Sequence, residues 1–331
     1  MRRVALVVAL VSAVLTVPVA AVRVLSRRGS AQLLAGPRRS PGEEDLAPAV
    51  DALGGEIVRL HARDGVCLAA RWLPNVADGA WQADPAEAIL LLHGYTGSVA
   101  PDLLEYGPFL RHTAGVLGLD FRGHGDSDDG PTTFGALEVE DVAGALRWLG
   151  ERGVTRVVIH GLSMGGITAI AAVAVLGDGS LESADMDLDA PADIAPPARP
   201  RIVGVVADSA APDVAIPVAS RIRAPASRFI AERLFDAAAR TLGVDPRDTE
   251  PGRVVALVEP VPLLLVHGEA DETVPLAEGR RLAAGAGPSA EHWIVPGAGH
   301  SLGHATFPEA YEDRITTFVR KAFLRARNAS L

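Results

Sequence analysis

The sequence is poor in cysteine and in positive charge. Cys67 is the only cysteine in 331 residues, which excludes an intrachain disulfide framework and a cysteine-rich metal site. The formal net charge is −10, so the chain has no broad basic surface, and nucleic acid is not expected as its main partner. An internal repeat is also missing. What is present is apolar: hydrophobic residues make up 48% of the chain, too many for a disordered protein, and predict a large core.

A long uncharged and apolar run lies at the amino terminus. Residues 4–22 carry no charge and follow Arg2 and Arg3. As a helix this run would reach about 28 Å, close to the thickness of a bilayer's hydrocarbon core. We therefore predict a transmembrane helix in residues 1–25 that anchors the protein, with a cleaved secretory signal as the alternative. Arginines on both sides of the run leave the side of the membrane open.

The remaining chain divides into a linker and a body. Residues 26–53 are rich in proline, glycine and charge, and predict a flexible linker. Residues 54–327 predict a single catalytic domain. Within it, the acidic stretch 177–200 is expected to be a solvated loop insertion. Residues 212–258 have helical tendency and are long enough to form a cap over one edge of a sheet.

Strand and helix patterns alternate through this body. The expected strands are residues 56–61, 66–73, 88–92, 115–119, 155–159, 202–207, 262–266 and 291–295. The expected helices include residues 135–151, 167–176 and 308–325. Most of these strands are continuously apolar, which is typical of parallel strands covered on both faces. The fold class is therefore α/β, with a mostly parallel central sheet flanked by helices and ligands expected at the carboxyl ends of the strands.

A nucleophile motif lies at one of these strand ends. Residues 161–165 read GLSMG and match G-x-S-x-G, between a strand and an apolar helix. In such a turn the serine occupies a strained, exposed position, and side chains two residues away on either side would clash. The pentapeptide alone is weak, but this context makes Ser163 the candidate nucleophile. The other interpretation is a serine in a glycine-rich structural turn.

A serine nucleophile needs a base and an acid that orients the base. Among the nine histidines, His300 follows the last strand in a glycine-rich loop and is the candidate base, with His304 as the fallback. Asp271 follows the preceding strand and is the candidate acid, with Asp208 as the second choice. The chain order Ser163, Asp271, His300 is that of α/β-hydrolases.

The oxyanion formed during acyl transfer needs two hydrogen-bond donors. The backbone N–H of Met164, directly after the nucleophile, is one candidate. The turn after the third expected strand reads HGYTG, and the N–H of Tyr95 is the candidate for the second donor.

Together these residues resemble the α/β-hydrolase superfamily, in particular serine aminopeptidase-like hydrolases, monoacylglycerol lipases and small esterases. The resemblance is carried by HGY at 93–95, DFRGHGDS at 120–127, GLSMGG at 161–166, GEAD at 268–271 and GH at 299–300. It covers residues 54–325 and is specific for fold and nucleophile class, not for substrate. It implies the α/β-hydrolase fold, no cofactor and no metal.

The expected reaction is hydrolysis of a carboxylic ester, thioester or amide bond through an acyl-enzyme. An acyltransferase using the same triad, an aminopeptidase-like peptidase and a non-catalytic binding module are the alternatives. A peptidase would need acids near the cap to hold a substrate ammonium group. The available acids are Glu232, Asp236, Glu250 and Glu259. The expected partners are a small ester or amide substrate and, through the amino terminus, a membrane.

Overall fold

A computed structural model describes residues 29–76, 81–95, 97–177 and 199–329. Its centre is an eight-stranded sheet in the order β1-β2-β4-β3-β5-β6-β7-β8. Only β2 runs opposite to the other strands, so the sheet is mostly parallel, as predicted. The strands are β1 (Glu56–His61), β2 (Cys67–Leu73), β3 (Glu87–Leu92), β4 (Gly115–Leu119), β5 (Arg156–Leu162), β6 (Arg201–Asp208), β7 (Leu263–Gly268) and β8 (Ala290–Val295).

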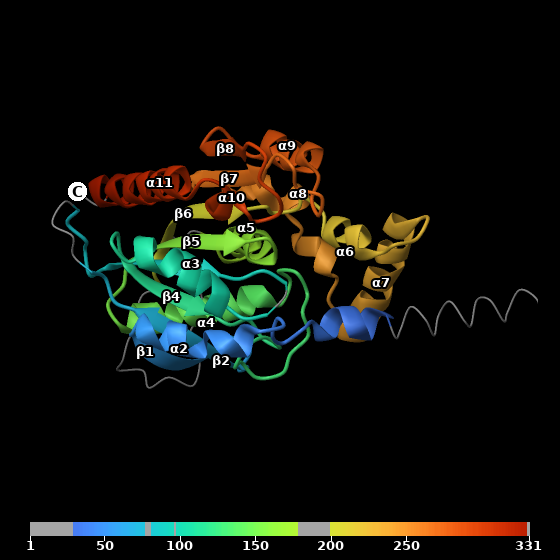
Figure 1. The fold of residues 1–331 in the computed structure, drawn as a ribbon, viewed down its shortest axis with the longest axis horizontal. Helices are drawn as coiled ribbons and strands as arrows, with labels where there is room; N and C mark the ends of the chain where they lie inside the picture. The colour runs from blue at the N-terminus through green and yellow to red at the C-terminus, as the bar shows by residue number, and fades with distance from the viewer. Residues whose placement is uncertain (1–28, 77–80, 96, 178–198, 330–331) are drawn as a thin grey trace, which may run out of the picture.

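Helices cover both faces of this sheet (Figure 1). On one face, α3 (Ala100–Leu110) and α11 (Pro308–Asn328) pack in one apolar cluster. On the other, α4 (Glu138–Glu151) and α5 (Met164–Leu176) pack in a second. All residues of β3 and β4 are buried, which explains why these strands are apolar without alternation. The helix α5 is apolar all round because almost every residue in it is buried.

Between β6 and β7 the chain forms a group of short helices. They are α6 (Ala215–Arg221), α7 (Ser227–Leu242), η2 (Pro246–Thr249), α8 (Pro251–Val254) and η3 (Val255–Val258). After β7 follow α9 (Leu276–Gly285), β8 and α10 (Gly303–Thr306). The helices α6 and α7 project from the body beyond the strands (Figure 1), in the region where the sequence predicts a cap.

The segment expected to be a flexible linker has regular structure instead. Residues 29–35 are helical, and η1 (Glu43–Leu46) and α2 (Ala47–Ala52) follow. Leu34 and Val50 are buried, each with 7% exposure. The expectation failed because prolines and glycines here permit turns between short helices, and the segment packs on the body through a few apolar side chains and its own backbone.

Two further expectations concern residues outside this description. Within the described part of the chain, no helix is both long and apolar enough to cross a bilayer. The predicted span at residues 4–22 lies outside the described residues, as does most of the acidic stretch 177–200.

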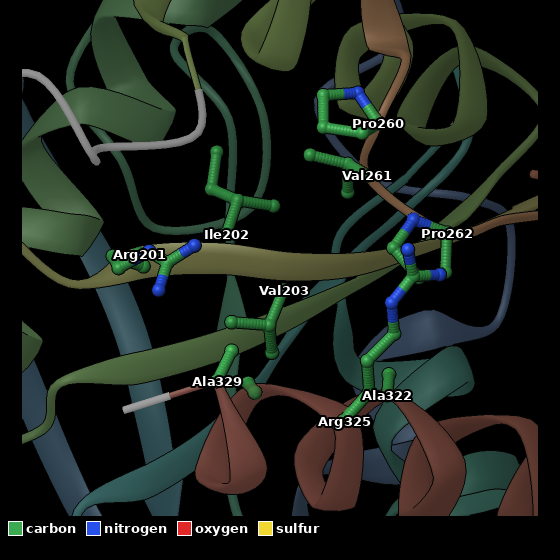
Figure 2. Close-up of a pocket in the computed structure, with 10 residues that line it drawn as sticks. Arg201, Ile202, Val203, Pro260, Val261, Pro262, Ala322, Arg325 and Ala329 are labelled. Carbon is green, nitrogen blue, oxygen red and sulfur yellow. The ribbon is translucent and has the colours of Figure 1, made fainter. Parts of the chain in front are cut away.

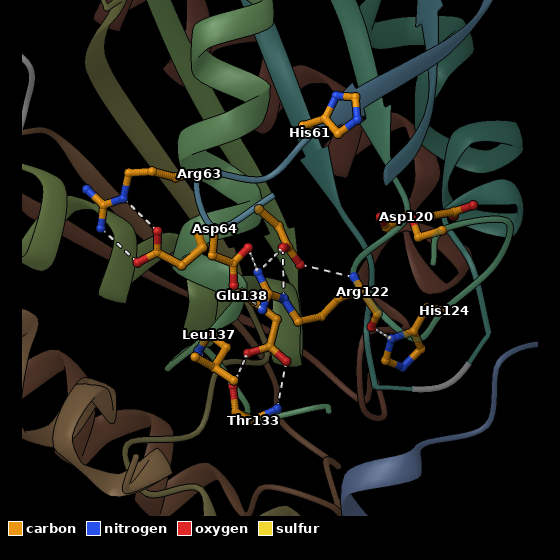
Figure 3. Close-up of polar contacts among 12 residues, drawn as sticks. His61, Arg63, Asp64, Asp120, Arg122, His124, Thr133, Leu137 and Glu138 are labelled. Carbon is orange, nitrogen blue, oxygen red and sulfur yellow. Dashed lines mark hydrogen bonds and ion pairs between the residues drawn. The ribbon is translucent and has the colours of Figure 1, made fainter. Parts of the chain in front are cut away.

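A buried arginine fixes the loop after β4. The Arg122 guanidinium bonds both oxygens of Asp64 at 2.7 and 2.9 Å, and Oδ1 of Asp141 at 2.6 and 2.9 Å (Figure 3). The side chain of Arg122 is 3% exposed and that of Asp141 is fully buried. A buried carboxylate without a cation is costly, so this arginine is needed for stability.

We therefore expect Arg122→Lys to lower the free energy of unfolding by about 2–4 kcal/mol, because an ammonium group cannot serve two carboxylates at once. Urea unfolding measures the change. The matched control is Arg63→Lys: Arg63 also bonds both oxygens of a carboxylate, that of Glu140, but its side chain is 39% exposed. That exposed pair should contribute less than about 1 kcal/mol. Equal losses in the two variants would show that burial is not the cause.

Candidate active site

Ser163 stands at the turn between β5 and α5, in a conformation that side chains rarely adopt. Its φ is 51° and its ψ is −110°. For a residue with a Cβ this conformation is strained, and such strain concentrates at functional sites. The N–H of Ser163 donates to the carbonyl oxygen of Asp208 at 2.7 Å, which holds the strained residue against the neighbouring strand β6.

The glycines on either side of Ser163 are required by close backbone contacts. A Cβ atom added to Gly161 would lie 2.2 Å from the carbonyl oxygen of Gly165. One added to Gly165 would lie 2.3 Å from the carbonyl oxygen of Leu92 at the end of β3. Both distances are far inside van der Waals contact, so no larger residue fits at either position. The turn therefore packs closely between α5, which it starts, and the end of β3.

Three side chains predicted from the sequence form a hydrogen-bonded chain. The hydroxyl of Ser163 is 2.8 Å from Nε2 of His300, and Nδ1 of His300 is 2.7 Å from Oδ2 of Asp271. In this arrangement the serine donates to the imidazole and the imidazole N–H donates to the carboxylate. The side chain of His300 is 19% exposed and that of Asp271 is fully buried. Ser163 and His300 are thus partly exposed to solvent, whereas the Asp271 side chain is not.

Asp271 is held by the backbone that follows it. Its Oδ1 accepts the N–H groups of Thr273 and Val274, both at 2.8 Å. The other oxygen is left for the imidazole. Because these bonds come from a turn just after β7, the carboxylate is oriented before any substrate arrives. Glu269, another acid in the same loop, accepts the N–H of Gly297 instead.

The loop that carries His300 is hydrogen-bonded to the end of β6, the strand that also accepts the N–H of Ser163. The N–H of Ser301 donates to the hydroxyl of Ser209 at 2.9 Å, and that hydroxyl donates to Oδ1 of Asp208 at 2.9 Å. Ser209 and Ser301 both have positive φ, 56° and 53°. Asp208 thus holds the nucleophile with its carbonyl and the loop of the base with its carboxylate. Sequence reasoning missed Ser209, because a lone serine after a strand has no distinguishing pattern.

Asp208, the second candidate for the acid, is engaged elsewhere. Its Oδ2 accepts the hydroxyl of Tyr311 at 2.7 Å, and that hydroxyl lies 3.3 Å from Nε2 of His160. Burial raises the pKa of the Asp208 carboxyl. Burial also lowers the pKa of His160, to about 3, with a smaller contribution from the charge of His304. These groups form a buried polar layer beneath the triad, between the sheet and α11.

The fallback base is also placed away from the nucleophile. Nδ1 of His304 lies 2.9 Å from Glu105, and its Nε2 lies 3.1 Å from Glu312. Both ring nitrogens are therefore used by carboxylates on α3 and α11.

Both candidate oxyanion donors border Ser163. Met164 is the first residue of α5, so its N–H has no partner within the helix. On the other side, a Cβ atom added to Gly94 would lie 3.7 Å from the Cβ of Ser163, which brings the 93–95 turn against the nucleophile. The ring of Tyr95 stacks on Phe134, with centroids 5.0 Å apart. That stacking holds the residue whose N–H is the second candidate.

A separate cavity of about 210 Å³ lies where β6 and β7 begin (Figure 2). It is bordered by Arg201, by Pro260 and Pro262 before β7, and by Arg325 near the end of α11. Ser163 follows the carboxyl end of β5, at the opposite edge of the sheet. This cavity is therefore not part of the candidate site.

The fold is an α/β fold with a mostly parallel sheet, and Ser163, His300 and Asp271 are hydrogen-bonded at the carboxyl ends of its strands. The alpha/beta hydrolase family matches residues 89–314, which is more than half of the chain. The chain therefore belongs to the alpha/beta hydrolase family, as its motifs predict.

Individual relatives are distant. The uncharacterized protein YfhR of Escherichia coli O157:H7 is 24% identical over 277 residues, 82% of this chain and 83% of YfhR. Among solved structures, the esterase Pf2001 of Pyrococcus furiosus is similar with a TM-score of 0.59 and 23% identity, over 86% of this chain and 98% of that one. The esterase EaEST of Exiguobacterium antarcticum has a TM-score of 0.53 and 15% identity, over 80% and 99% of the two chains. At these identities the likeness shows the fold.

The buried imidazole of His160 should make the protein sensitive to acid. With a folded pKa of about 3, His160 stays neutral while the unfolded chain takes up a proton below about pH 6.5. Its contribution to stability is therefore lost as the pH falls from about 6.5 towards 3, at up to about 1.4 kcal/mol per pH unit. We expect the stability of His160→Gln to fall less steeply than that of wild type between pH 6.5 and 4.5.

Urea unfolding across this pH range measures the difference. A His61→Gln variant, changed at an exposed position on β1, is the matched control. Parallel acid slopes for wild type and His160→Gln would contradict the prediction.

Proposed function

We propose that this protein hydrolyses carboxylic ester bonds through an acyl-enzyme on Ser163. The observation that carries the proposal is the hydrogen-bonded chain from Ser163 through His300 to Asp271, at 2.8 and 2.7 Å. Each member comes from the loop after a different strand, and the nucleophile has the strained backbone that exposes its hydroxyl. A structural serine in a glycine-rich turn would need neither partner.

The mechanism follows from this geometry. His300 takes the proton of the Ser163 hydroxyl as the oxygen attacks the ester carbonyl, and Asp271 stabilises the imidazolium that forms. The imidazolium gives this proton to the leaving alcohol. The alcohol departs, and the acyl group remains on Ser163 as the acyl-enzyme. Water then attacks the acyl-enzyme by the same route, the acid is released, and Ser163 recovers its proton. The N–H groups of Met164 and Tyr95 would hold the oxyanion in both halves of the reaction.

An ester substrate is supported better than a peptide. The four acids that could hold a substrate ammonium group all have partners within the protein. Glu232 and Asp236 pair with Arg247, Glu250 with Arg253, and Glu259 accepts from Ser289. The two solved structures named above are described as esterases, which also supports an ester substrate over a peptide.

Replacement of the nucleophile tests the proposal. Ser163→Ala should abolish hydrolysis of short p-nitrophenyl esters, a loss of at least about 10³-fold in kcat, and prevent labelling by a fluorophosphonate. The melting temperature should not fall, because alanine fits the space of serine. Product analysis with added alcohol separates hydrolysis from acyl transfer. Retained hydrolysis or labelling in the alanine variant would refute the assignment.

We also propose that residues 1–25 anchor the protein in a membrane. The support is the uncharged run at 4–22, which is long enough to cross a bilayer as a helix. Fractionation of cells producing the full chain should place the protein in the membrane pellet after an alkaline wash. Recovery in the soluble fraction would contradict the anchor, and a mature chain beginning near Ala21 would favour the secretory signal.

A further inference from the structure

The residues before the first strand make an unexpected contact with the candidate site. We call residues 33–43 the N-terminal strap. They include the end of the helical segment 29–35 and lead to the start of η1. The helical segment begins against α7: a Cβ atom added to Gly29 would lie 2.7 Å from Leu234. From there the strap runs across the turn after β3, which carries Tyr95. The blue start of the chain lies beside α7 in Figure 1.

Three hydrogen bonds join the strap to this turn. The hydroxyl of Tyr95 donates to the carbonyl of Leu33 at 2.8 Å, and the N–H of Gly97 donates to the carbonyl of Pro37 at 3.2 Å. The hydroxyl of Ser98 donates to the carboxylate of Glu43. These bonds follow the turn from one end to the other, so its position depends on the strap.

Gly97 shows how closely the strap approaches. Its φ is +88°, and a Cβ atom there would lie 2.5 Å from the Glu43 carboxylate and 2.7 Å from the Ser40 hydroxyl. Glu43 is 4% exposed and also accepts the N–H of Ser40 at 2.6 Å. The buried Glu43 carboxylate therefore accepts hydrogen bonds from both the strap and the turn, and it links the two segments in a defined position.

The strap is also hydrogen-bonded on its other side. The guanidinium of Arg38 donates to the carbonyls of Gly125 and Ser127 at 3.0 and 2.6 Å and pairs with Asp129. The N–H of Gly125 donates back to the carbonyl of Arg38 at 2.8 Å. The loop holding these partners is the one that Arg122 fixes to the body. The strap therefore connects a rigid loop to the Tyr95 turn.

From these contacts we infer that the N-terminal strap positions the oxyanion hole. The inference rests on the proposed function, in which the Tyr95 N–H is one of two donors to the oxyanion. The direction of that N–H is set by the peptide between Gly94 and Tyr95. The carbonyl of this peptide, that of Gly94, lies 2.6 Å from Nδ1 of His93. On the other side of the Tyr95 Cα, the carbonyl of Tyr95 lies 2.9 Å from Nε2 of His124, and the hydroxyl of Tyr95 is bound to Leu33. The strap residues are positioning residues and touch no substrate.

Loss of strap contacts should therefore slow the chemical step more than it weakens substrate binding. Removal of a whole oxyanion donor typically costs about 10²–10³ in kcat. A donor that is displaced but still present should cost less, about tenfold. KM should change less than about twofold, because the donor acts mainly on the transition state.

The test uses two variants of the full chain and their combination. Tyr95→Phe removes the hydroxyl that binds Leu33 and keeps the ring on Phe134. Arg38→Ala removes the link to the loop. We expect kcat for a short p-nitrophenyl ester to fall about tenfold in each and further in the double variant. The affinity for a short trifluoromethyl ketone, which forms a tetrahedral adduct with the serine, should fall by the same factor.

A control separates positioning from general loss of stability. Ile315→Val changes a fully buried residue of α11 and should lower the melting temperature without changing kcat or ketone affinity. The inference is overturned if Tyr95→Phe and Arg38→Ala lower only the melting temperature and leave kcat and ketone affinity unchanged, as the control does. It is also overturned if these two variants raise KM alone. Wild type that neither hydrolyses esters nor binds the ketone would instead overturn the proposed function, and the role of the strap with it.

Discussion

The close approach of three backbone segments at Ser163 is the constraint on which the candidate site depends. The turn after β5 must pass so near to the end of β3 that Gly165 has no room for a Cβ, and Ser163 then takes a positive φ. Parallel strands make this possible, because their carboxyl ends lie side by side and are covered by helices on both faces. The strain at one residue is balanced by the packing of β3, β5 and α5 together.

The end of the neighbouring strand β6 also fixes the position of His300, the candidate base. Asp208 bonds the nucleophile through its carbonyl and, through Ser209, the loop that carries His300. Placing a carboxylate in the core is costly, and the hydroxyls of Ser209 and Tyr311 reduce that cost by donating to it. The buried residues Asp208, Ser209 and Tyr311 thus help to fix the distance between Ser163 and His300.

The sequence was most informative where the physical cause is local. The central strands and the helix after Ser163 could be predicted, because burial on both faces leaves continuous apolar runs and the tight turn demands glycines at 161 and 165. The partners of the site could not be predicted in the same way. Ser209 contacts Ser301 across 92 residues, and no local pattern marks such a pair. Residues 26–53 were misjudged because the strap is held in part through the backbone carbonyls of Leu33, Pro37 and Arg38, and a carbonyl is a group that any residue possesses.

This difference explains why the strap resembles a linker in composition and yet belongs to the site. A segment that binds through its backbone needs turns at the right places, and proline and glycine supply them. It needs few apolar residues of its own, because the body provides most of the buried surface. The strap begins at Leu33, eleven positions after the predicted membrane span at 4–22, and the carbonyl of Leu33 already accepts the hydroxyl of Tyr95.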